Sequence, residues 1–306
     1  MPQQHQLFFQ NSVINYYLFG NGPNLLLAFH GYGATGNEFS LLEKKLDEKY
    51  TIIAIDFPFH GATVWKESNF SIIDLLKILQ EIISELPSFL IKNGDANESG
   101  FSRLSSLPIN RYGEARPNYR SVGRGLGVRA SLISFSMGGR VTLSLLQQIP
   151  NQIECAVLIA PDGLHVNFWY WLSTQTWLGN KLFKYSMKNP KWLFALLKIA
   201  DKTRLLNKSI IKLVHYYMDD KQERLQLYER WTMMRKFNPK LQQIKTITQK
   251  NNIPLRFLFG KHDNIILSKR SGIFKPAENV EIKIIEAGHK LMQPKHLTDI
   301  TDLLCK

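Results

Sequence analysis

Cysteine is scarce in this sequence, and long apolar runs are absent. The 306 residues include two cysteines, Cys155 in an apolar segment and Cys305 next to the last residue. The pattern does not require a disulfide, and a reducing compartment fits it better. No apolar stretch reaches the ~20 residues of a membrane span, and residues 1–10 lack the basic start and apolar core of a signal peptide. We therefore expect a cytoplasmic protein.

Acidic residues are also few. The chain has 25 Asp and Glu against 39 Lys and Arg, which gives a formal net charge of +14. The imbalance is concentrated between Gly163 and Lys250, with 17 basic and five acidic residues. Such a field favours an anionic substrate or an anionic surface, although a solvated lysine-rich exterior explains it equally well. Nothing specific supports contact with a membrane, and the sequence does not define an oligomeric state.

Lysine is missing from one segment altogether. Residues 94–129 contain no lysine, although the rest of the chain has 26, and they hold six of the 13 arginines among many glycines and serines. This composition predicts a loop or disordered insertion, and its abruptness is also consistent with untrimmed noncoding sequence. No interleaved aromatic residues or nucleic-acid-binding motif accompany the arginines, so we expect no nucleic-acid partner.

The full chain has the composition of a globular protein, with 44% hydrophobic and 21% charged residues. Apolar runs predict strands over 24–30, 50–56, 131–135, 154–160, 254–259 and 280–285. Helical patterns fall at 39–46, 72–86, 140–148 and 295–304. Strands that alternate with helices predict βαβ units and a largely parallel sheet. Residues 162–250 are helical, basic and aromatic instead, and hold five of the six tryptophans.

A candidate nucleophile lies between a predicted strand and a predicted helix. The sequence Ser-Phe-Ser-Met-Gly-Gly spans 134–139. A sharp turn from strand to helix lifts the middle residue, Ser136, clear of the sheet, and it needs small neighbours. The general pattern is G-x-S-x-G, and Ser134 replaces the first glycine here. The motif alone is moderately specific, because similar runs occur in ordinary Gly/Ser loops.

A candidate acid and a candidate base follow two later strands. Asp263 comes just after the strand at 254–259, and His289 just after the strand at 280–285. Catalytic groups in open α/β sheets gather at these carboxyl ends, and the chain order Ser, Asp, His is that of α/β-hydrolases. Histidine takes the serine proton, and the acid fixes its tautomer. Asp56, Asp162 and His262 are rival polar residues near strand ends.

Two backbone N–H groups are the candidates for an oxyanion hole. Met137 directly follows the nucleophile, and Tyr32 lies between glycines in the turn after the first predicted strand. Glycines on either side leave room for a substrate to approach the backbone. We interpret His30 and His60 as structural residues that shape their loops.

These motifs resemble those of the α/β-hydrolase superfamily. The resemblance covers 24–60 and 129–304, and it rests on His30-Gly31, the run Asp56-Phe57-Pro58-x-His60-Gly61, Ser136, Asp263 and His289. It implies an α/β-hydrolase fold, with a mostly parallel eight-stranded sheet, helices on both faces and a helical cap after the sixth strand. The core would then span 1–161 and 251–306, and the cap, or lid, 162–250.

The resemblance also implies an enzyme. Carboxylesterases are among the relatives, which predicts hydrolysis of a small ester-like or acyl substrate through an acyl-enzyme, with no metal or organic cofactor. Other relatives resemble the synthase of menaquinone biosynthesis that eliminates pyruvate, or the C–C bond hydrolases, and would act on an anionic metabolite. A non-catalytic, ligand-binding relative is a third hypothesis. The serine argues against haloalkane dehalogenases and epoxide hydrolases, which use aspartate at this turn.

Overall fold

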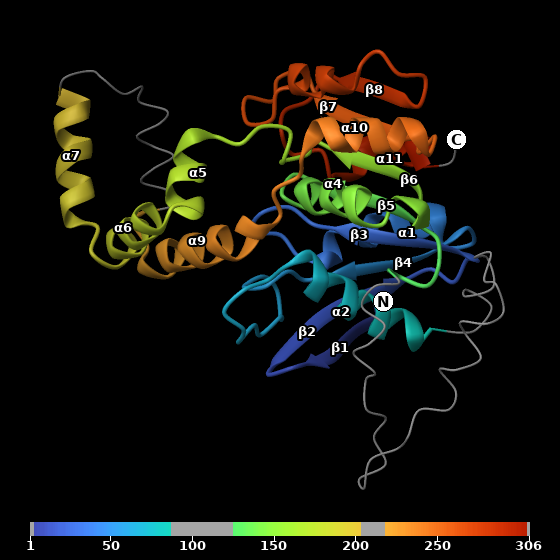
Figure 1. Ribbon diagram of the computed structural model, residues 1–306, viewed down its shortest axis with the longest axis horizontal. Helices are drawn as coiled ribbons and strands as arrows, with labels where there is room; N and C mark the ends of the chain where they lie inside the picture. Colours follow the sequence, from blue (N-terminus) through green and yellow to red (C-terminus); the bar gives the residue numbers. More distant parts are fainter. Residues whose placement is uncertain (1–2, 87–124, 203–217, 305–306) are drawn as a thin grey trace, which may run out of the picture. The chain divides into compact units, whose positions relative to one another are not determined.

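The computed structural model describes residues 3–86, 125–202 and 218–304, which divide into two compact units (Figure 1). The first unit consists of Met1–Glu67, Ser71–Leu164 and Phe237–Lys306. The second consists of Ser68–Phe70 and His165–Lys236. No helix in the described ranges is long and apolar enough to cross a membrane.

The first unit is built on one eight-stranded sheet of order β1-β2-β4-β3-β5-β6-β7-β8. Pairing is parallel from β4 through β8, and antiparallel where β2 meets β1 and β4. The strands are β1 Gln3–Phe9, β2 Ser12–Phe19, β3 Asn24–Phe29, β4 Tyr50–Ile55, β5 Ala130–Phe135, β6 Ile153–Ile159, β7 Leu255–Gly260 and β8 Val280–Ile285. The mostly parallel sheet expected from the sequence is confirmed.

Helices cover both faces of this sheet. They are α1 Ser40–Leu46, α2 Ile72–Ser84, α4 Gly138–Gln148, α10 Leu241–Lys250 and α11 Leu297–Leu304, with short 3₁₀ turns η1 Gly36–Phe39, η4 Pro150–Gln152, η6 Ser268–Phe274 and η7 Pro294–His296. The connection from β3 to β4 moves toward the β1 edge of the sheet, whereas the later connections between parallel strands move toward the β8 edge. Because these crossovers are right-handed, α1 lies on one face of the sheet and α2, α4 and α10 lie on the other. Accordingly α11 packs on α1, and α4 packs between α2 and α10.

The central strands are buried on both faces. In β3, Leu26, Leu27, Ala28 and Phe29 are all fully buried. Successive side chains of a strand point to opposite faces, so a continuous buried run requires cover on each side, as in parallel sheets. This is why these strands read as unbroken apolar runs in the sequence.

The hairpin β1–β2 did not stand out in the sequence. Leu7 pairs with Ile14 and Phe8 with Val13, and Gln10 takes a left-handed φ of 55° in the connecting turn. β1 is an edge strand that is rich in glutamine, and Phe8 is exposed. One face of such a strand meets solvent, so it lacks the apolar run that marks the central strands.

The second unit is helical. It contains α5 Phe168–Gln175, α6 Trp177–Lys188, α7 Lys191–Lys202, α9 Lys221–Met233 and the 3₁₀ turn η5 Met234–Lys236. Its span differs from the predicted lid of 162–250, because α10 belongs to the first unit. There α10 packs on α4 and fully buries Ile244. The role of the second unit as a lid stays a prediction.

The predicted insertion at 94–129 falls mostly outside the described residues, which resume at Gly125. Its last five residues are described and belong to the first unit. Leu126 and Val128 are buried, and the Leu126 N–H donates to Gln152 Oε1 at 2.6 Å. These residues lead directly into β5, so the boundary at 129 was placed too late. Cys155 in β6 is buried and free, and Cys305 lies outside the described residues.

Candidate active site

Ser136 occupies the sharp turn between β5 and α4. Its φ of 47° lies in the left-handed region, which is uncommon for a residue other than glycine. Three backbone hydrogen bonds hold the turn: Ser136 N–H donates to Ile159 O at 3.0 Å, and Ser136 O accepts from Gly139 N at 2.9 Å and Asp162 N at 2.7 Å. A strained conformation persists only where its surroundings fix it, and here the neighbouring strand and helix do so.

The two glycines after Met137 are required by close packing. A Cβ on Gly138 would lie 2.0 Å from the backbone oxygen of Phe29 in β3. A Cβ on Gly139 would lie 2.4 Å from Pro161 Cβ. The start of α4 therefore sits directly against the ends of β3 and β6, and only glycine leaves space for that approach.

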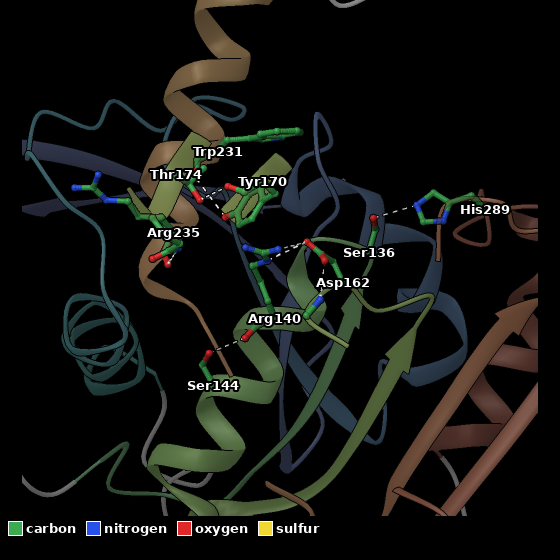
Figure 2. A network of polar contacts seen from close by, with 11 residues as sticks. Ser136, Arg140, Ser144, Asp162, Tyr170, Thr174, Trp231, Arg235 and His289 are labelled. Carbon is green, nitrogen blue, oxygen red and sulfur yellow. Dashed lines mark hydrogen bonds and ion pairs between the residues drawn. The ribbon is translucent and has the colours of Figure 1, made fainter. Parts of the chain in front are cut away.

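Ser136, His289 and Asp263 form one hydrogen-bonded series. His289 Nε2 lies 3.0 Å from Ser136 Oγ, as Figure 2 shows, and His289 Nδ1 lies 2.8 Å from Asp263 Oδ2. An ionised carboxylate only accepts hydrogen bonds, so the proton of the neutral ring belongs on Nδ1. Nε2 then accepts from the serine hydroxyl, which is the arrangement that a general base needs.

Asp263 is held by both of its carboxylate oxygens. Its side chain is fully buried, and Oδ1 accepts the N–H groups of Ile265 at 2.7 Å and Ile266 at 2.9 Å. The other oxygen is left to bond His289. The His289 ring keeps 19% of its surface exposed, and its centroid lies 5.4 Å from that of Phe135. Asp263 thus fixes the orientation of the imidazole through Nδ1, and part of the ring remains accessible to solvent.

Two of the rival residues have other partners. Asp162 Oδ2 accepts from Arg140 Nη2 at 2.6 Å and Nε at 2.9 Å (Figure 2), and its Oδ1 accepts from Gly163 N at 2.7 Å. His262 Nε2 lies 2.9 Å from Glu286 Oε2 in an exposed pair. The Arg140–Asp162 pair ties α4 to the segment after β6 and so braces the turn at the nucleophile.

The third rival, Asp56, joins the loops around the end of β4. It accepts hydrogen bonds from Asn15 Nδ2 at 2.7 Å, Gly36 N at 2.7 Å and Ala62 N at 3.1 Å. Burial raises its pKa above the ordinary value, although these three donors act in the opposite direction. Gly61 has a φ of 53°, and a Cβ there would overlap the Asp56 carboxylate. Asp56 therefore has a structural role in this unit.

His30 and His60 are engaged in loop hydrogen bonds, as we expected. His30 Nδ1 lies 2.7 Å from Gly31 O, and its Nε2 accepts the Phe57 N–H at 3.0 Å. His60 Nδ1 lies 2.9 Å from Pro58 O. Both rings are buried. Their bonds fix the turns that follow β3 and β4.

The turn that carries Tyr32 lies against the nucleophile. A Cβ on Gly31 would come within 2.9 Å of the Phe135 ring and 3.4 Å of Ser136 Cβ, so this turn passes closely over the end of β5. Tyr32 is the next residue. Met137 lies at the N-terminus of α4, where the first N–H groups of a helix have no intrahelical acceptor. Met137 therefore adjoins Ser136 in the chain, and Tyr32 follows a glycine that lies close to Ser136. The oxyanion hole itself stays a prediction.

Sequence reasoning missed Glu38. Its Oε1 accepts the N–H of Gly31 at 3.0 Å, which anchors the turn before Tyr32. Burial raises the pKa of Glu38 to about 7, and the Gly31 hydrogen bond only partly opposes this effect. A single glutamate at the start of a 3₁₀ turn carries no signal in the sequence that separates it from a solvated one.

No model of a protein family and no curated protein matches this sequence. Solved structures do match along almost its whole length. An esterase from Thermogutta terrifontis is 13% identical, with a TM-score of 0.60 and coverage of 99% of this chain and 98% of that one. A thioesterase domain from the curacin biosynthetic pathway is also 13% identical, with a TM-score of 0.55 and 99% of both chains covered.

A third solved structure, from Acinetobacter baumannii AYE and named as a lipase, is 16% identical, with a TM-score of 0.56 and coverage of 99% of this chain and 90% of that one. All three are hydrolases by name, and this chain has a mostly parallel eight-stranded sheet with helices on both faces. The chain has the α/β-hydrolase fold.

Proposed function

We propose that this protein is a serine hydrolase that acts on a small ester-like or acyl substrate. One observation carries the proposal: the series Asp263–His289–Ser136, with 2.8 and 3.0 Å between successive polar atoms, ends at a serine in a left-handed turn. A binding module needs neither a buried carboxylate aimed at an imidazole nor an imidazole aimed at a hydroxyl.

The first chemical step is acylation. Ser136 Oγ attacks the carbonyl carbon of the substrate while His289 Nε2 takes the hydroxyl proton. The carbonyl double bond opens, and the negative charge moves to its oxygen. Asp263 keeps the imidazole in the required tautomer and stabilises its cation. His289 then returns the proton to the leaving alcohol as the bond between carbonyl carbon and leaving group breaks.

The negatively charged oxygen that forms from the substrate carbonyl needs hydrogen-bond donors that are already in place. The Met137 N–H at the start of α4 and the Tyr32 N–H beside Gly31 are our candidates. Glu38, through its bond to Gly31 N–H, positions the backbone of this turn. Preformed donors stabilise the developing charge without reorganising in the reaction, and a single one is typically worth about 10²–10³ in rate.

The second step is deacylation. His289 accepts a proton from water, whose oxygen attacks the acyl-enzyme, and the tetrahedral intermediate then collapses. The carboxylic acid leaves, and Ser136 Oγ regains its proton from His289. The two reaction steps balance in atoms and charge with water as the only co-reactant, so the proposed mechanism requires no cofactor.

The alternative is elimination or C–C bond cleavage in an anionic metabolite by the same three residues. The excess of positive charge between 163 and 250 favours an anionic substrate. In that reaction Ser136 serves as base or hydroxyl donor, and no acyl-enzyme accumulates. The two chemistries therefore differ in a covalent intermediate that can be detected.

The decisive experiment is acyl trapping. The full chain is mixed with an activated ester such as p-nitrophenyl butyrate, quenched in acid and analysed by intact-mass and peptide mass spectrometry. We expect the mass of one butyryl group on the peptide that contains Ser136. A fluorophosphonate probe should label the same residue.

The matched control is a serine on the adjoining helix. Ser144 lies in α4 and donates to Arg140 O at 2.8 Å, so Ser144→Ala should be labelled like the wild type. Ser136→Ala should not be labelled. Labelling that survives Ser136→Ala contradicts the proposal, as does turnover of an anionic substrate with no trapped acyl group at any time point.

A further inference from the structure

Helix α6 of the second unit has one side that is packed and fixed. The Phe183 ring lies 5.4 Å from the Tyr228 ring and 5.8 Å from the Trp231 ring of α9. Asn180 donates to Thr232 Oγ1 at 3.1 Å. Met187 is 4% exposed. These contacts determine which side of α6 is turned away from its own unit.

The opposite side of α6 exposes large apolar side chains. Trp177 is 72% exposed, Leu178 71%, Leu182 52% and Tyr185 57%. Leu178, Leu182 and Tyr185 follow the i, i+4 and i+7 spacing that places side chains on one side of a helix, and Trp177 lies about two turns before Tyr185. A single exposed leucine is ordinary, but a contiguous apolar patch marks an interaction surface.

Lysines share this side of the helix. Lys181, Lys184 and Lys188 are exposed, and at 100° per residue they fall on the same arc as Trp177. The Lys181 Nζ lies 3.8 Å from the centroid of the Trp177 ring. We refer to Trp177, Leu178, Lys181, Leu182, Lys184, Tyr185 and Lys188 as the α6 face.

The neighbouring part of the chain has the same character. In α5, which packs on α6 (Figure 1), Phe168 is 60% exposed and Trp169 70%. From 163 to 200 the sequence contains five lysines and no aspartate or glutamate. Exposed aromatic rings and lysines therefore coincide on these two helices. Lys184 of the α6 face has a partner on α9, because its Nζ lies 5.7 Å from the centroid of the Tyr228 ring and its charge acts on Glu229.

We propose that the α6 face binds the surface of an anionic lipid bilayer. Helices that lie in a membrane interface combine Trp, Phe and Leu with Lys and Arg, and tryptophan and tyrosine are enriched at that depth. The positive charge of the face complements the negative headgroups, which attract each nearby lysine.

The lysines distinguish a bilayer from a protein partner. Interfaces between proteins are depleted of lysine at their centres, because a buried ammonium must lose its water. Lys181 lies between Trp177 and Tyr185 along the helix and would be central in any such interface. At a bilayer the same side chain lays its stem along the apolar surface and keeps its ammonium among the headgroups.

Vesicle binding tests this inference with the full chain. Cosedimentation is measured with vesicles of phosphatidylcholine alone and of phosphatidylcholine with phosphatidylserine at about 3:1. We expect binding that rises steeply with phosphatidylserine. The triple variant Lys181→Gln, Lys184→Gln and Lys188→Gln should bind roughly 100-fold more weakly, since each lysine contributes about fivefold.

The apolar part of the face is tested in the same way. The triple variant Trp177→Ser, Leu178→Ser and Leu182→Ser should lose at least roughly tenfold in binding to the same vesicles. Circular dichroism and the midpoint of thermal unfolding check that each variant folds. Because the side chains are exposed, we expect unfolding midpoints close to that of the wild type.

Matched controls lie in the first unit. Lys44→Gln, Lys49→Gln and Lys250→Gln remove the same charge from exposed positions and should retain binding. A second control replaces exposed apolar side chains, with Phe8→Ser and Ile284→Ser. Equal losses in control and face variants would overturn the proposal, because binding would then reflect net charge or apolarity alone.

Two further outcomes also overturn it. One is the absence of cosedimentation with phosphatidylserine vesicles. The other is a dimer in sedimentation velocity without lipid that the Trp177→Ser, Leu178→Ser and Leu182→Ser variant loses, which would assign the face to a second copy. Ser136→Ala should bind vesicles like the wild type, so this test succeeds or fails independently of the proposed hydrolysis.

Discussion

Ser136 combines a reactive position with an unfavourable backbone conformation. Its left-handed φ of 47° costs about 1–2 kcal/mol in a residue with a Cβ. Ser136→Ala keeps the Cβ, so we expect unchanged stability and a loss of roughly 10⁴ to 10⁶ in turnover. Ser136→Gly should be equally inactive yet more stable by up to about 1 kcal/mol, as strain relief outweighs the added flexibility of glycine.

Ester hydrolysis and urea denaturation check these expectations together. Activity of Ser136→Ala within tenfold of the wild type would show that another residue is the nucleophile. A less stable Ser136→Gly would show instead that the hydroxyl, rather than the three backbone hydrogen bonds, holds the turn in place.

Asp263 and Asp162 provide a matched pair of acids. Asp263→Asn should keep the fold and lose on the order of 10⁴ in kcat, because an amide permits the wrong tautomer of His289. Asp162→Asn breaks the ion pair with the buried Arg140, which should cost about 1–3 kcal/mol of stability with a much smaller loss of kcat. Steady-state kinetics and denaturation of both variants test this. The reverse pattern would identify Asp162 as the catalytic acid.

Glu38 predicts a pH dependence of stability. Its pKa is raised by burial from 4.5 to about 7, so the folded state binds the proton more tightly than the unfolded state. As pH rises from about 4.5 to about 7, the unfolded chain ionises first and the free energy of unfolding falls, by on the order of 3 kcal/mol. Glu38→Gln should remove this contribution.

The measurement is urea denaturation of wild type and Glu38→Gln between pH about 4.5 and about 7.5. The difference between them should change through that window and level off above it. Glu48→Gln, at an exposed position nearby, should follow the wild type at every pH. A Glu38→Gln protein with the same pH profile as the wild type would contradict the raised pKa.

Single residues show where sequence reasoning reaches its limit. The grouping of Ser136, Asp263 and His289 could be predicted because each lies shortly after a strand, and parallel strands end at the same edge of the sheet. The sequence did not exclude Asp162, because its pairing with Arg140 appears only when α4 and the segment after β6 come together in space. Glu38 was missed for the same reason.

At the scale of elements, burial on both faces made strands easy to predict. The runs at 131–135 and 50–56 match the buried strands β5 and β4, each to within a residue. The β1–β2 hairpin was not predicted, because one face of its outer strand meets solvent. Its register also depends on pairing between the two strands that no local pattern encodes. Likewise α10 reads as one more basic helix, and only its packing on α4 assigns it to the first unit.

The connection from α2 to β5 yields a prediction about segments. Returns of this kind usually need about two to six residues, so replacing residues 94–124 with a short linker should preserve stability and activity. A replacement that extends to Arg129 also removes Leu126 and Val128, which are buried. We expect that longer deletion to cost about 2–5 kcal/mol.

Thermal unfolding and ester hydrolysis of the two deletion variants test the segment, and limited trypsin digestion of the wild type adds an independent measurement. Trypsin should cut first between Arg103 and Arg124. Sparing of that window, or failure of the shorter deletion to fold, would mean that the segment has a structural role.

At the scale of the whole molecule, the uneven charge is the main feature that the site does not use. The net charge of +14 gives a positive field, most of it arising between 163 and 250. Such fields act over about 30 Å at 0.01 M salt but only about 3 Å at 1 M. The lysines of the α6 face contribute to the same field, so lipid binding and attraction of an anionic substrate would share one electrostatic source.

Ionic strength therefore tests the charge of the substrate. Two esters of equal acyl length are compared, one ending in a carboxylate and one in a neutral amide. If the field steers the substrate, kcat/KM for the anionic ester should fall roughly 10-fold between about 0.02 and 0.5 M salt. The neutral ester should change less than about twofold, which controls for effects of salt on the protein. The Lys44→Gln and Lys49→Gln variant removes charge outside residues 163–250 and should keep most of the salt dependence. Parallel profiles for the two esters would mean that the basic residues do not guide the substrate, and the lysine-rich surface would then serve solvation or lipid binding alone.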